Sequence, residues 1–184
     1  MDMLFQLDGE ILLWIQENLR KEFLNPIVTF LTGLGDAGWF WILLCALLLL
    51  SGKYRKTGMT GFVALLIGFL ITNLCLKNMV MRIRPYELVE GLELIGKKAV
   101  DFSFPSGHST ASIAASAVFF LKLPKKFGIP AILLGILICL SRLYIGIHYP
   151  TDVFAGAMIG LFAAFAAIFL TDRKKEKTDI SHLS

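Results

Sequence analysis

The stretch "TDVFAGAMIGLFAAFAAIFLT", residues 151–171, decides the fold, because it contains no charged residue after Asp152. A helix needs roughly 20 apolar residues to cross about 30 Å of hydrocarbon, and this stretch provides them. The whole 184-residue chain is 56% hydrophobic and has a mean hydropathy of +0.70, both too high for an ordinary soluble domain. Four further apolar runs precede this one, at residues 37–51, 59–76, 109–121 and 128–146.

The first residues follow a different pattern. Between residues 8 and 34, charged side chains are interspersed with apolar residues at helical spacing, among them Ile11, Ile15 and Leu19. This pattern predicts an amphipathic helix in the membrane interface and a short second helix after Pro26; the alternative is an imperfect sixth span. The start is acidic and has no basic region before an apolar core, so we expect no signal peptide. We therefore predict an all-α fold: an integral membrane helical bundle of five to six transmembrane helices with an N-terminal amphipathic segment.

The domain organisation follows from these runs. We predict an amphipathic interfacial segment or imperfect first span at 1–36, a membrane domain at 37–171 and a basic cytoplasmic tail at 172–184. The sequence shows no repeat, low-complexity segment or interdomain linker. The three cysteines lie inside apolar runs without paired spacing, and we interpret them as small buried hydrophobic residues: Cys45, Cys75 and Cys139.

Basic residues in the loops predict the orientation. Short stretches after the first, third and last apolar runs carry ten of them: Lys53, Arg55, Lys56, Lys122, Lys125, Lys126, Arg173, Lys174, Lys175 and Lys177. By the positive-inside rule, these stretches and the C-terminus face the cytoplasm. Residues 77–108 and 141–150 then face the outer compartment together. These outer segments also carry basic residues, which conflicts with the positive-inside rule. The conflict disappears if some of those cations bind a substrate.

Three polar clusters occur on the predicted outer side, each at the end or the beginning of an apolar run. They are Lys77 with Arg84, then Ser106, Gly107 and His108, and finally Arg142, His148 and Asp152. Ionisable residues at membrane depth are costly and by default indicate a functional site. Cations with few acids near them repel one another, and an anion with several oxygens relieves this repulsion. Arginine and lysine both suit phosphate, so the clusters predict a phosphate site.

The second and third clusters each indicate a chemical role. Ser106 can cap the helix that begins beside it, and Gly107 lets the backbone approach an anion at the positive end of that helix. A proline at the first helical position places Asp152 in the first turn of the last span, within reach of one nitrogen of His148. The other nitrogen is then free to act as a nucleophile, and His108 can protonate a departing oxygen.

Each cluster also has a simpler structural interpretation. Pro-Ser-Gly-His is a common cap and turn sequence, Lys77 can extend from the end of a span to the interface, and Arg84 can be a loop cation. Asp152 can be only a helix cap, and His148 only a polar loop residue. Taken singly, each simpler interpretation is preferred. Together they do not explain why all these polar groups fall on one side of the membrane, so we favour a functional site.

With these motifs, the chain resembles the type 2 phosphatidic acid phosphatase superfamily, in its small bacterial membrane branch. The resemblance rests on three motifs in order: Lys77 with six residues before Arg84-Pro85, then Pro105-Ser106-Gly107-His108, then Ser141-Arg142 with five residues before His148 and three more before Asp152. All three match without a departure, and the resemblance runs from the first motif through the last span. Residues 1–36 carry none of it.

The resemblance implies a membrane-embedded lipid phosphatase that needs no metal ion or other cofactor. It implies that His148 forms a phosphohistidine, that Asp152 orients His148, and that His108 protonates the leaving group and later helps to activate water. It also implies which residues hold the phosphate oxygens: Lys77, Arg84, Ser106, Gly107 and Arg142. The implied substrate is a phosphorylated lipid that enters sideways between helices. The implied location is the plasma membrane of a bacterium, with the active site on the outer face.

Family members of this size act on undecaprenyl diphosphate, phosphatidylglycerophosphate, phosphatidate or related lipids. We favour undecaprenyl diphosphate, because an outward-facing site fits the recycling of a carrier lipid in cell-wall synthesis. The alternatives are an anion transporter, a lipid-binding protein without catalysis, and an oxidase that uses bound vanadate. A transporter would need polar residues near mid-membrane on several helices, and a non-catalytic protein would have lost His148 or Asp152. We expect no nucleic-acid partner, and the sequence leaves the oligomeric state open.

Overall fold

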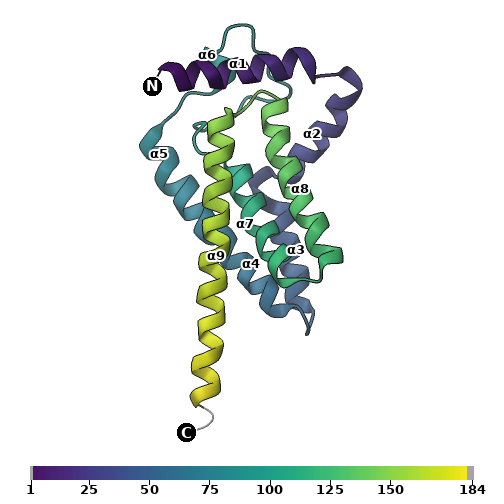
Figure 1. Cartoon of the computed structure of the whole chain (residues 1–184), viewed down its shortest axis with the longest axis vertical. Helices are drawn as coiled ribbons and strands as arrows, with labels where there is room; N and C mark the ends of the chain where they lie inside the picture. Colours follow the sequence, from purple (N-terminus) through teal and green to yellow (C-terminus); the bar gives the residue numbers. More distant parts are fainter. Residues whose placement is uncertain (1, 182–184) are drawn as a thin grey trace.

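Helices dominate residues 2–181, the part of the chain that the computed structural model describes (Figure 1). No strand occurs among these residues. The helices are α1 (Asp2–Asn18), η1 (Glu22–Leu24), α2 (Asn25–Leu34), η2 (Asp36–Gly38), α3 (Trp39–Leu50), α4 (Arg55–Phe69), η3 (Leu70–Leu76), α5 (Lys77–Val80), α6 (Pro85–Leu88), α7 (Gly107–Lys122), α8 (Lys125–Tyr144) and α9 (Pro150–Ser181). The five apolar runs fall on α3, on α4 with η3, on α7, on α8 and on α9, which confirms the all-α prediction.

Helix α7 lies at the centre of the bundle, where it contacts α4, α8 and α9 (Figure 1). Its residues from Ser109 to Phe119 are nearly all buried, and many are Ala or Ser, whose small side chains let neighbouring backbones approach closely. At Gly156 of α9, an added Cβ would lie only 2.5 Å from the carbonyl oxygen of Ser106. This close approach places the first turns of α9 against the start of α7, so two of the predicted clusters meet there.

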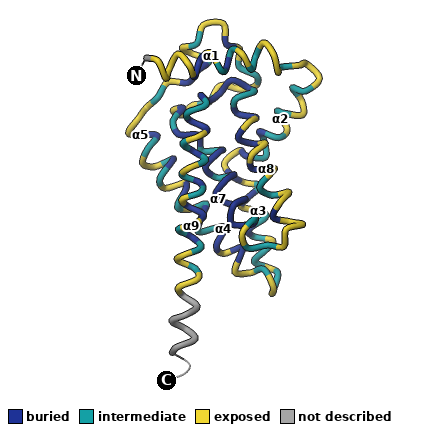
Figure 2. The backbone as a smooth tube through the Cα atoms, in the orientation of Figure 1, coloured by how far each residue is buried: buried dark blue, intermediate teal, exposed yellow. Residues whose placement is uncertain are grey.

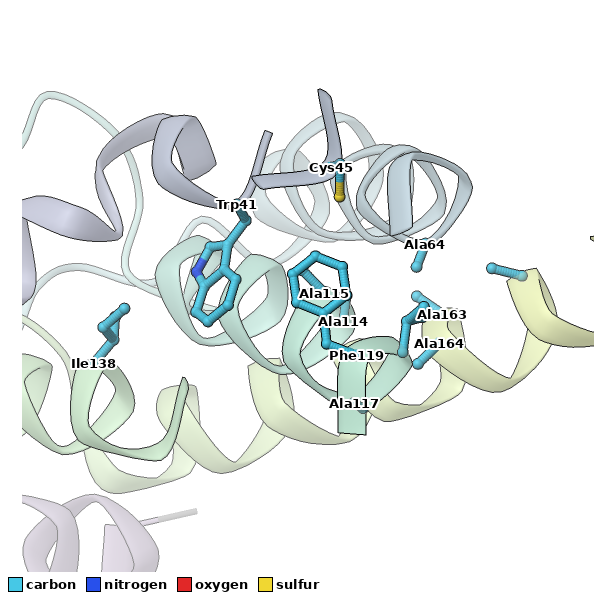
Figure 3. Packing of buried hydrophobic residues seen from close by; sticks show 12 residues of the cluster. Trp41, Cys45, Ala64, Ala114, Ala115, Ala117, Phe119, Ile138, Ala163 and Ala164 are labelled. Atoms are coloured by element: carbon cyan, nitrogen blue, oxygen red, sulfur yellow. The ribbon is translucent and has the colours of Figure 1, made fainter. Parts of the chain in front are cut away.

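The main apolar core lies between α3, α4, α7, α8 and α9 (Figure 3). The rings of Trp41 and Phe119 fill its centre, with their centroids 6.2 Å apart, and small alanine side chains surround them. The indole Nε1 of Trp41 donates a hydrogen bond of 3.0 Å to Oγ of Ser112, so the one polar atom of this ring is satisfied. Two of the three cysteines are buried as predicted. The prediction was wrong for Cys75, which is exposed.

The outer surface of the bundle is apolar, as contact with lipid requires. Along α9, the side chains of Phe154, Phe162, Phe165 and Phe169 recur at helical spacing and are each more than half exposed. Such a stripe would be unfavourable in water, because it leaves a contiguous apolar patch unburied. A bilayer removes that cost, so the stripe supports a membrane location.

Several described segments are long and apolar enough to cross a membrane. They are Arg55–Leu88, Lys125–Tyr144 and Pro150–Arg173, and the pair Glu22–Leu34 and Asp36–Leu50, bent by 46°, is a fourth if it counts as one span. Five to six spans were predicted. The difference includes α7, whose 16 residues fall short of the roughly 20 that a span needs. Helix α7 lies at the centre of the bundle, where protein rather than lipid surrounds most of it.

Helix α1 lies across one end of the bundle rather than through it (Figure 1). Leu12 of α1 is fully buried while Trp14 is exposed, so the helix is amphipathic as predicted. It is not among the described segments that are long and apolar enough to span a membrane, and the choice between an interfacial segment and an imperfect span stays a prediction. Buried residues, dark blue in Figure 2, continue from the centre of the bundle to the region beneath α1. Of the predicted tail at 172–184, the residues up to 181 continue α9, and residues 182–184 lie outside the described part.

Candidate active site

The eight predicted site residues gather at the end of the bundle that α1 covers. They are Lys77 at the start of α5, Arg84 just before α6, Ser106, Gly107 and His108 at the start of α7, Arg142 in the last turn of α8, His148 in the loop that follows, and Asp152 in the first turn of α9. Six of them are buried, the exceptions being Gly107 and His108, which are partly exposed. Burial of so many ionisable groups is costly, and the structure must compensate for it with specific partners.

The local structure at two helix starts agrees with the sequence patterns. Ser106 is the N-cap of α7, and its Oγ accepts the backbone N–H of Ser109 at 3.4 Å. Pro150 is the first residue of α9, which places Asp152 in the first turn. The backbone N–H of Ser106 donates to the carbonyl oxygen of Asp152 at 3.1 Å, so the two helix starts are joined directly. Both positive helix ends therefore lie next to each other, where an anion is favoured.

His148 lies between a carboxylate and a guanidinium. Its Nδ1 is 3.5 Å from Oδ2 of Asp152, and its Nε2 is 3.4 Å from Nη1 of Arg84. Ser103 stands beside the first pair, because its Oγ donates to Oδ2 of Asp152 at 2.5 Å and lies 3.4 Å from Nδ1. Burial lowers the pKa of His148 to about 3 and outweighs the opposing effect of its hydrogen bond with Asp152. The imidazole is therefore neutral near pH 7, with Nε2 directed at a cation.

The first cluster has an acidic partner that the sequence did not reveal. The carboxylate of Asp101 bridges Lys77 Nζ and Arg84 Nη2, the latter at 2.5 Å. Partial burial alone would raise the pKa of Asp101, but the hydrogen bond and charge of Lys77 and the charge of Arg84 hold this pKa below its usual value. The expectation that few acids lie near these cations is therefore wrong. The Asp101 side chain is 47% exposed, whereas both cations are buried.

His108 also has a carboxylate partner. Its Nε2 lies 2.8 Å from Oδ1 of Asp36, which belongs to the sharp bend between α2 and α3. The bend brings Asp36 to the site because Ala37 and Gly38 both adopt positive φ angles, 48° and 68°. Asp36 is mostly exposed, so this pair is far more accessible than the pair of His148 and Asp152.

The side chain of Arg142 forms no hydrogen bond or ion pair with another predicted site residue in the described part of the chain. Its Nη1 donates to Oγ1 of Thr32 at 2.5 Å, and in the described part of the chain its buried Nε has no hydrogen-bond partner. A buried, unsatisfied donor on a cation favours an anion close by. Ser141, the preceding residue of the motif, donates to the backbone carbonyl of Ile138 at 2.6 Å.

A cavity of about 560 Å³ connects this polar end to the apolar part of the bundle. Its polar wall includes Lys77, Asp101, Gly107 and His108. Its apolar wall comes from α3 and α4 and is formed by Ile42, Phe62, Leu65, Leu66 and Phe69. A molecule with a charged head and an apolar chain matches such a cavity. Among the described residues, no group of three or more His, Cys, Asp or Glu side chains is placed to hold a metal ion.

Comparison with known proteins shows which family this is. The profile of the PAP2 superfamily matches residues 58–176, which is more than half of the chain and includes all eight predicted site residues. The chain therefore belongs to the PAP2 superfamily, the family that its three motifs predicted. It is a membrane phosphatase of that family.

Relatives and solved structures agree with this assignment. An undecaprenyl-diphosphatase from Sulfolobus acidocaldarius is 32% identical over 145 residues, 79% of this chain and 69% of the relative. The undecaprenyl-diphosphatase BcrC of Bacillus subtilis is 29% identical over 161 residues, 85% of this chain and 80% of the relative. The crystal structure of a transmembrane PAP2-type phosphatidylglycerolphosphate phosphatase from Bacillus subtilis superposes with a TM-score of 0.77 and 25% identity, covering 94% of this chain and 88% of that one.

Proposed function

We propose that the substrate is a membrane lipid with a phosphate or diphosphate group and that His148 is the nucleophile. The surroundings of His148 carry this proposal: Nδ1 faces Asp152, while Nε2 lies 3.4 Å from a guanidinium nitrogen of Arg84. A neutral imidazole held in this way can attack phosphorus through Nε2. The adjacent guanidinium attracts the phosphate oxygens and stabilises the charge that develops on them.

The reaction then proceeds in two steps. In the first, Nε2 of His148 bonds to phosphorus, and the bond from phosphorus to the leaving oxygen breaks, which is the ester oxygen of a monophosphate or the bridging oxygen of a diphosphate. Protonated His108 gives that oxygen its proton. In the second, His108 takes a proton from water while the water oxygen bonds to phosphorus and the bond from phosphorus to Nε2 of His148 breaks. Inorganic phosphate leaves and His148 returns to its neutral state. The carboxylate of Asp152 stabilises the positive charge on the imidazole of His148 during attack.

The remaining predicted residues hold the phosphate group. Lys77, Arg84 and Arg142 supply positive charge, and Ser106 and the backbone of Gly107 supply the start of α7. Loss of one such contact typically costs about 10²- to 10³-fold in rate. The carboxylate of Asp101 must leave Lys77 and Arg84 when phosphate arrives, and its half-exposed loop position allows that movement.

Undecaprenyl diphosphate is the substrate that we favour. Two relatives that match at 32% and 29% identity are named undecaprenyl-diphosphatases. Phosphatidylglycerophosphate is the main alternative, because a structure that covers 94% of this chain is a phosphatidylglycerolphosphate phosphatase. Phosphatidate is the other alternative. The apolar wall of the cavity suits the chain of any of these lipids, so the head group is what the experiment must distinguish.

The proposed location is a bacterial plasma membrane, with the site on the outer face and the C-terminus in the cytoplasm. The ten basic residues in the other loops and the tail support this orientation. In a cysteine-free background, Lys97→Cys in the long loop should react with an impermeant maleimide in intact cells. Lys125→Cys should react only after permeabilisation, and the reverse result would invert the proposed orientation.

The first test is phosphate release by the purified protein in detergent, with EDTA present. Undecaprenyl diphosphate, phosphatidylglycerophosphate and phosphatidate are compared side by side, and His148→Ala serves as the control. We expect release that persists in EDTA, is fastest with undecaprenyl diphosphate and disappears in the variant. No release from any of the three lipids by folded protein would overturn the proposed function.

A further inference from the structure

A buried ionic network joins the N-terminal helix to the first turn of α9. Asp8 of α1 is only 2% exposed. Its Oδ2 accepts hydrogen bonds from Arg82 Nη2 at 2.8 Å and from Thr151 Oγ1 at 2.5 Å, and its Oδ1 accepts the backbone N–H of Thr151 at 3.1 Å. Asp8 lies outside the residues 58–176 that match the family, so its role must be derived from this chain.

Arg82 is the centre of the network. Its Nη1 donates to Oδ1 of Asp152 and to Oγ1 of Thr151, both at 2.7 Å. Its guanidinium carbon lies 3.8 Å from the centre of the Tyr149 ring, so one face of the planar guanidinium makes a cation–π contact with this ring. Asp8, Asp152 and Tyr149 thus fix Arg82 from three directions, which leaves its side chain little freedom.

The consequence for Asp152 is that its two oxygens have separate partners. Oδ1 accepts a hydrogen bond from Nη1 of Arg82. Oδ2 accepts from Ser103 Oγ at 2.5 Å and from the backbone N–H of Tyr149 at 3.0 Å, and it is the oxygen that faces His148. The backbone carbonyl of Arg82 also accepts the N–H of Ser103 at 2.8 Å. One residue therefore orients both the carboxylate and the hydroxyl next to Nδ1 of His148.

Neither Asp8 nor Arg82 lines the cavity that has Lys77 and His108 on its wall. Among the described residues, the hydrogen bonds of the Arg82 side chain reach the proposed site through Asp152, so we expect its effect to pass through that carboxylate. Removing Arg82 would leave Oδ1 of the fully buried Asp152 carboxylate without its cation. The carboxylate group would then rotate, take up a proton or bind a water molecule. Each of these outcomes changes the orientation of His148 without removing any group that touches phosphate.

We propose that Arg82 and Asp8 are positioning residues of the phosphatase: Arg82 holds Asp152 in the orientation that His148 needs, and Asp8 holds Arg82. Helix α1 is then part of the catalytic architecture and not only a membrane-surface segment. The inference rests on the proposed function of His148 and Asp152. It predicts that kcat falls while KM stays nearly constant, because the phosphate-binding groups remain in place.

The test compares the steady-state kinetics of wild type with those of three single variants, Arg82→Gln, Arg82→Lys and Asp8→Asn. A double variant that carries both Asp8→Asn and Arg82→Gln is measured with them. Glu10→Gln, an exposed carboxylate on the same helix, is the matched control. We expect kcat to fall about 10- to 100-fold in Arg82→Gln and less in Asp8→Asn, as is usual when a group behind a site residue is lost. Arg82→Lys should recover part of the rate, and the double variant should be no slower than Arg82→Gln alone.

The outcomes separate this inference from the function on which it rests. A folded wild type that hydrolyses none of the three lipids overturns the proposed function, and the inference with it. An active wild type with unchanged kcat in folded Arg82→Gln and Asp8→Asn overturns the inference alone, as does a rise in KM at constant kcat. If Arg82→Gln does not fold, Arg82→Lys decides: a kcat equal to that of wild type overturns the inference.

Discussion

Two aspartates stand at opposite ends of the apolar part of α9, and their surroundings differ sharply. Asp152, in the first turn, is fully buried, pairs with Arg82 and faces His148. Asp172, beyond the apolar stretch, is nearly half exposed and pairs with Lys56 and Lys122. The same helix thus has a buried ionic cluster at one end and an exposed one at the other.

The two aspartates differ in the free-energy cost of burying their charge. An exposed ion pair contributes about 0–1 kcal/mol, and losing one partner has little consequence. Removing one partner of a buried pair costs about 3–5 kcal/mol, because an uncompensated charge remains. The exposed ion pairs of Asp172 are sufficient for folding at one end of α9. Folding alone therefore does not require that the ionic cluster of Asp152 at the other end be buried. The cost at Asp152 therefore accompanies the residues that we propose for catalysis.

Replacement of His148 should have the largest effect. His148→Gln keeps a buried polar side chain of similar size but removes the nucleophilic nitrogen, so we expect phosphate release to fall by about 10⁴-fold or more. Protein incubated with lipid ³²P-labelled in the transferred phosphate and quenched in SDS at alkaline pH, where a phosphohistidine is stable, should carry label in wild type and none in the variant. Size-exclusion chromatography in detergent serves as the folding control. Label retained in His148→Gln would show that another residue forms the covalent intermediate.

The two aspartates of α9 allow a matched pair of substitutions. Asp152→Asn should lower kcat by about 10²- to 10⁴-fold, because the amide no longer stabilises a positively charged imidazole. Asp172→Asn changes the same side chain on the same helix, and we expect it to alter kcat by less than about twofold. Equal losses in the two variants would mean that the burial of Asp152 serves stability rather than catalysis.

Much of the fold and site could be predicted because the signals are local. An apolar stretch of 21 residues is sufficient to predict a membrane helix. Ser106 before a helix, and Pro150 with Asp152 at the start of another, are cap patterns that depend only on neighbouring residues, and the structure has both. The three motifs also needed only spacing along the chain.

The partners of these residues were not predictable, because they depend on how distant segments pack. Asp36 and His108 are 72 positions apart, and Asp8 and Arg82 are 74 apart. Nothing near Asp8 distinguishes it from the other charges of an amphipathic helix until that helix lies across the end of the bundle. Asp101 precedes the second motif by only a few residues, and its place in the predicted outer loop was the one available signal.

Removal of the Asp101 carboxylate should moderately strengthen substrate binding, whereas the preceding substitutions are expected to reduce activity. Its carboxylate occupies Lys77 and Arg84 and stays ionised, since these cations hold its pKa below the usual value despite partial burial. Asp101→Asn removes a competing negative charge, so we expect KM, and the Ki for inorganic phosphate, to fall about 3- to 10-fold, equivalent to about 1 kcal/mol. Glu90→Gln, exposed in the same loop, is the control. A higher KM in Asp101→Asn would show that Asp101 assists binding instead.

The smallest effect concerns stability at mildly acidic pH. Burial lowers the pKa of His148 in the folded protein to about 3, against about 6.5 when the chain is unfolded. Between these values the unfolded state binds more protons, so the free energy of unfolding decreases as pH falls, by up to about 1.4 kcal/mol per unit. We expect detergent-solubilised wild type to lose more stability between pH 7.5 and 5.5 than His148→Gln, measured by SDS titration. The cations beside Asp101 hold its pKa below the usual value, so this carboxylate stays ionised in the same range. An equal loss in both proteins would mean that His148 takes up a proton as readily in the folded state as in the unfolded chain.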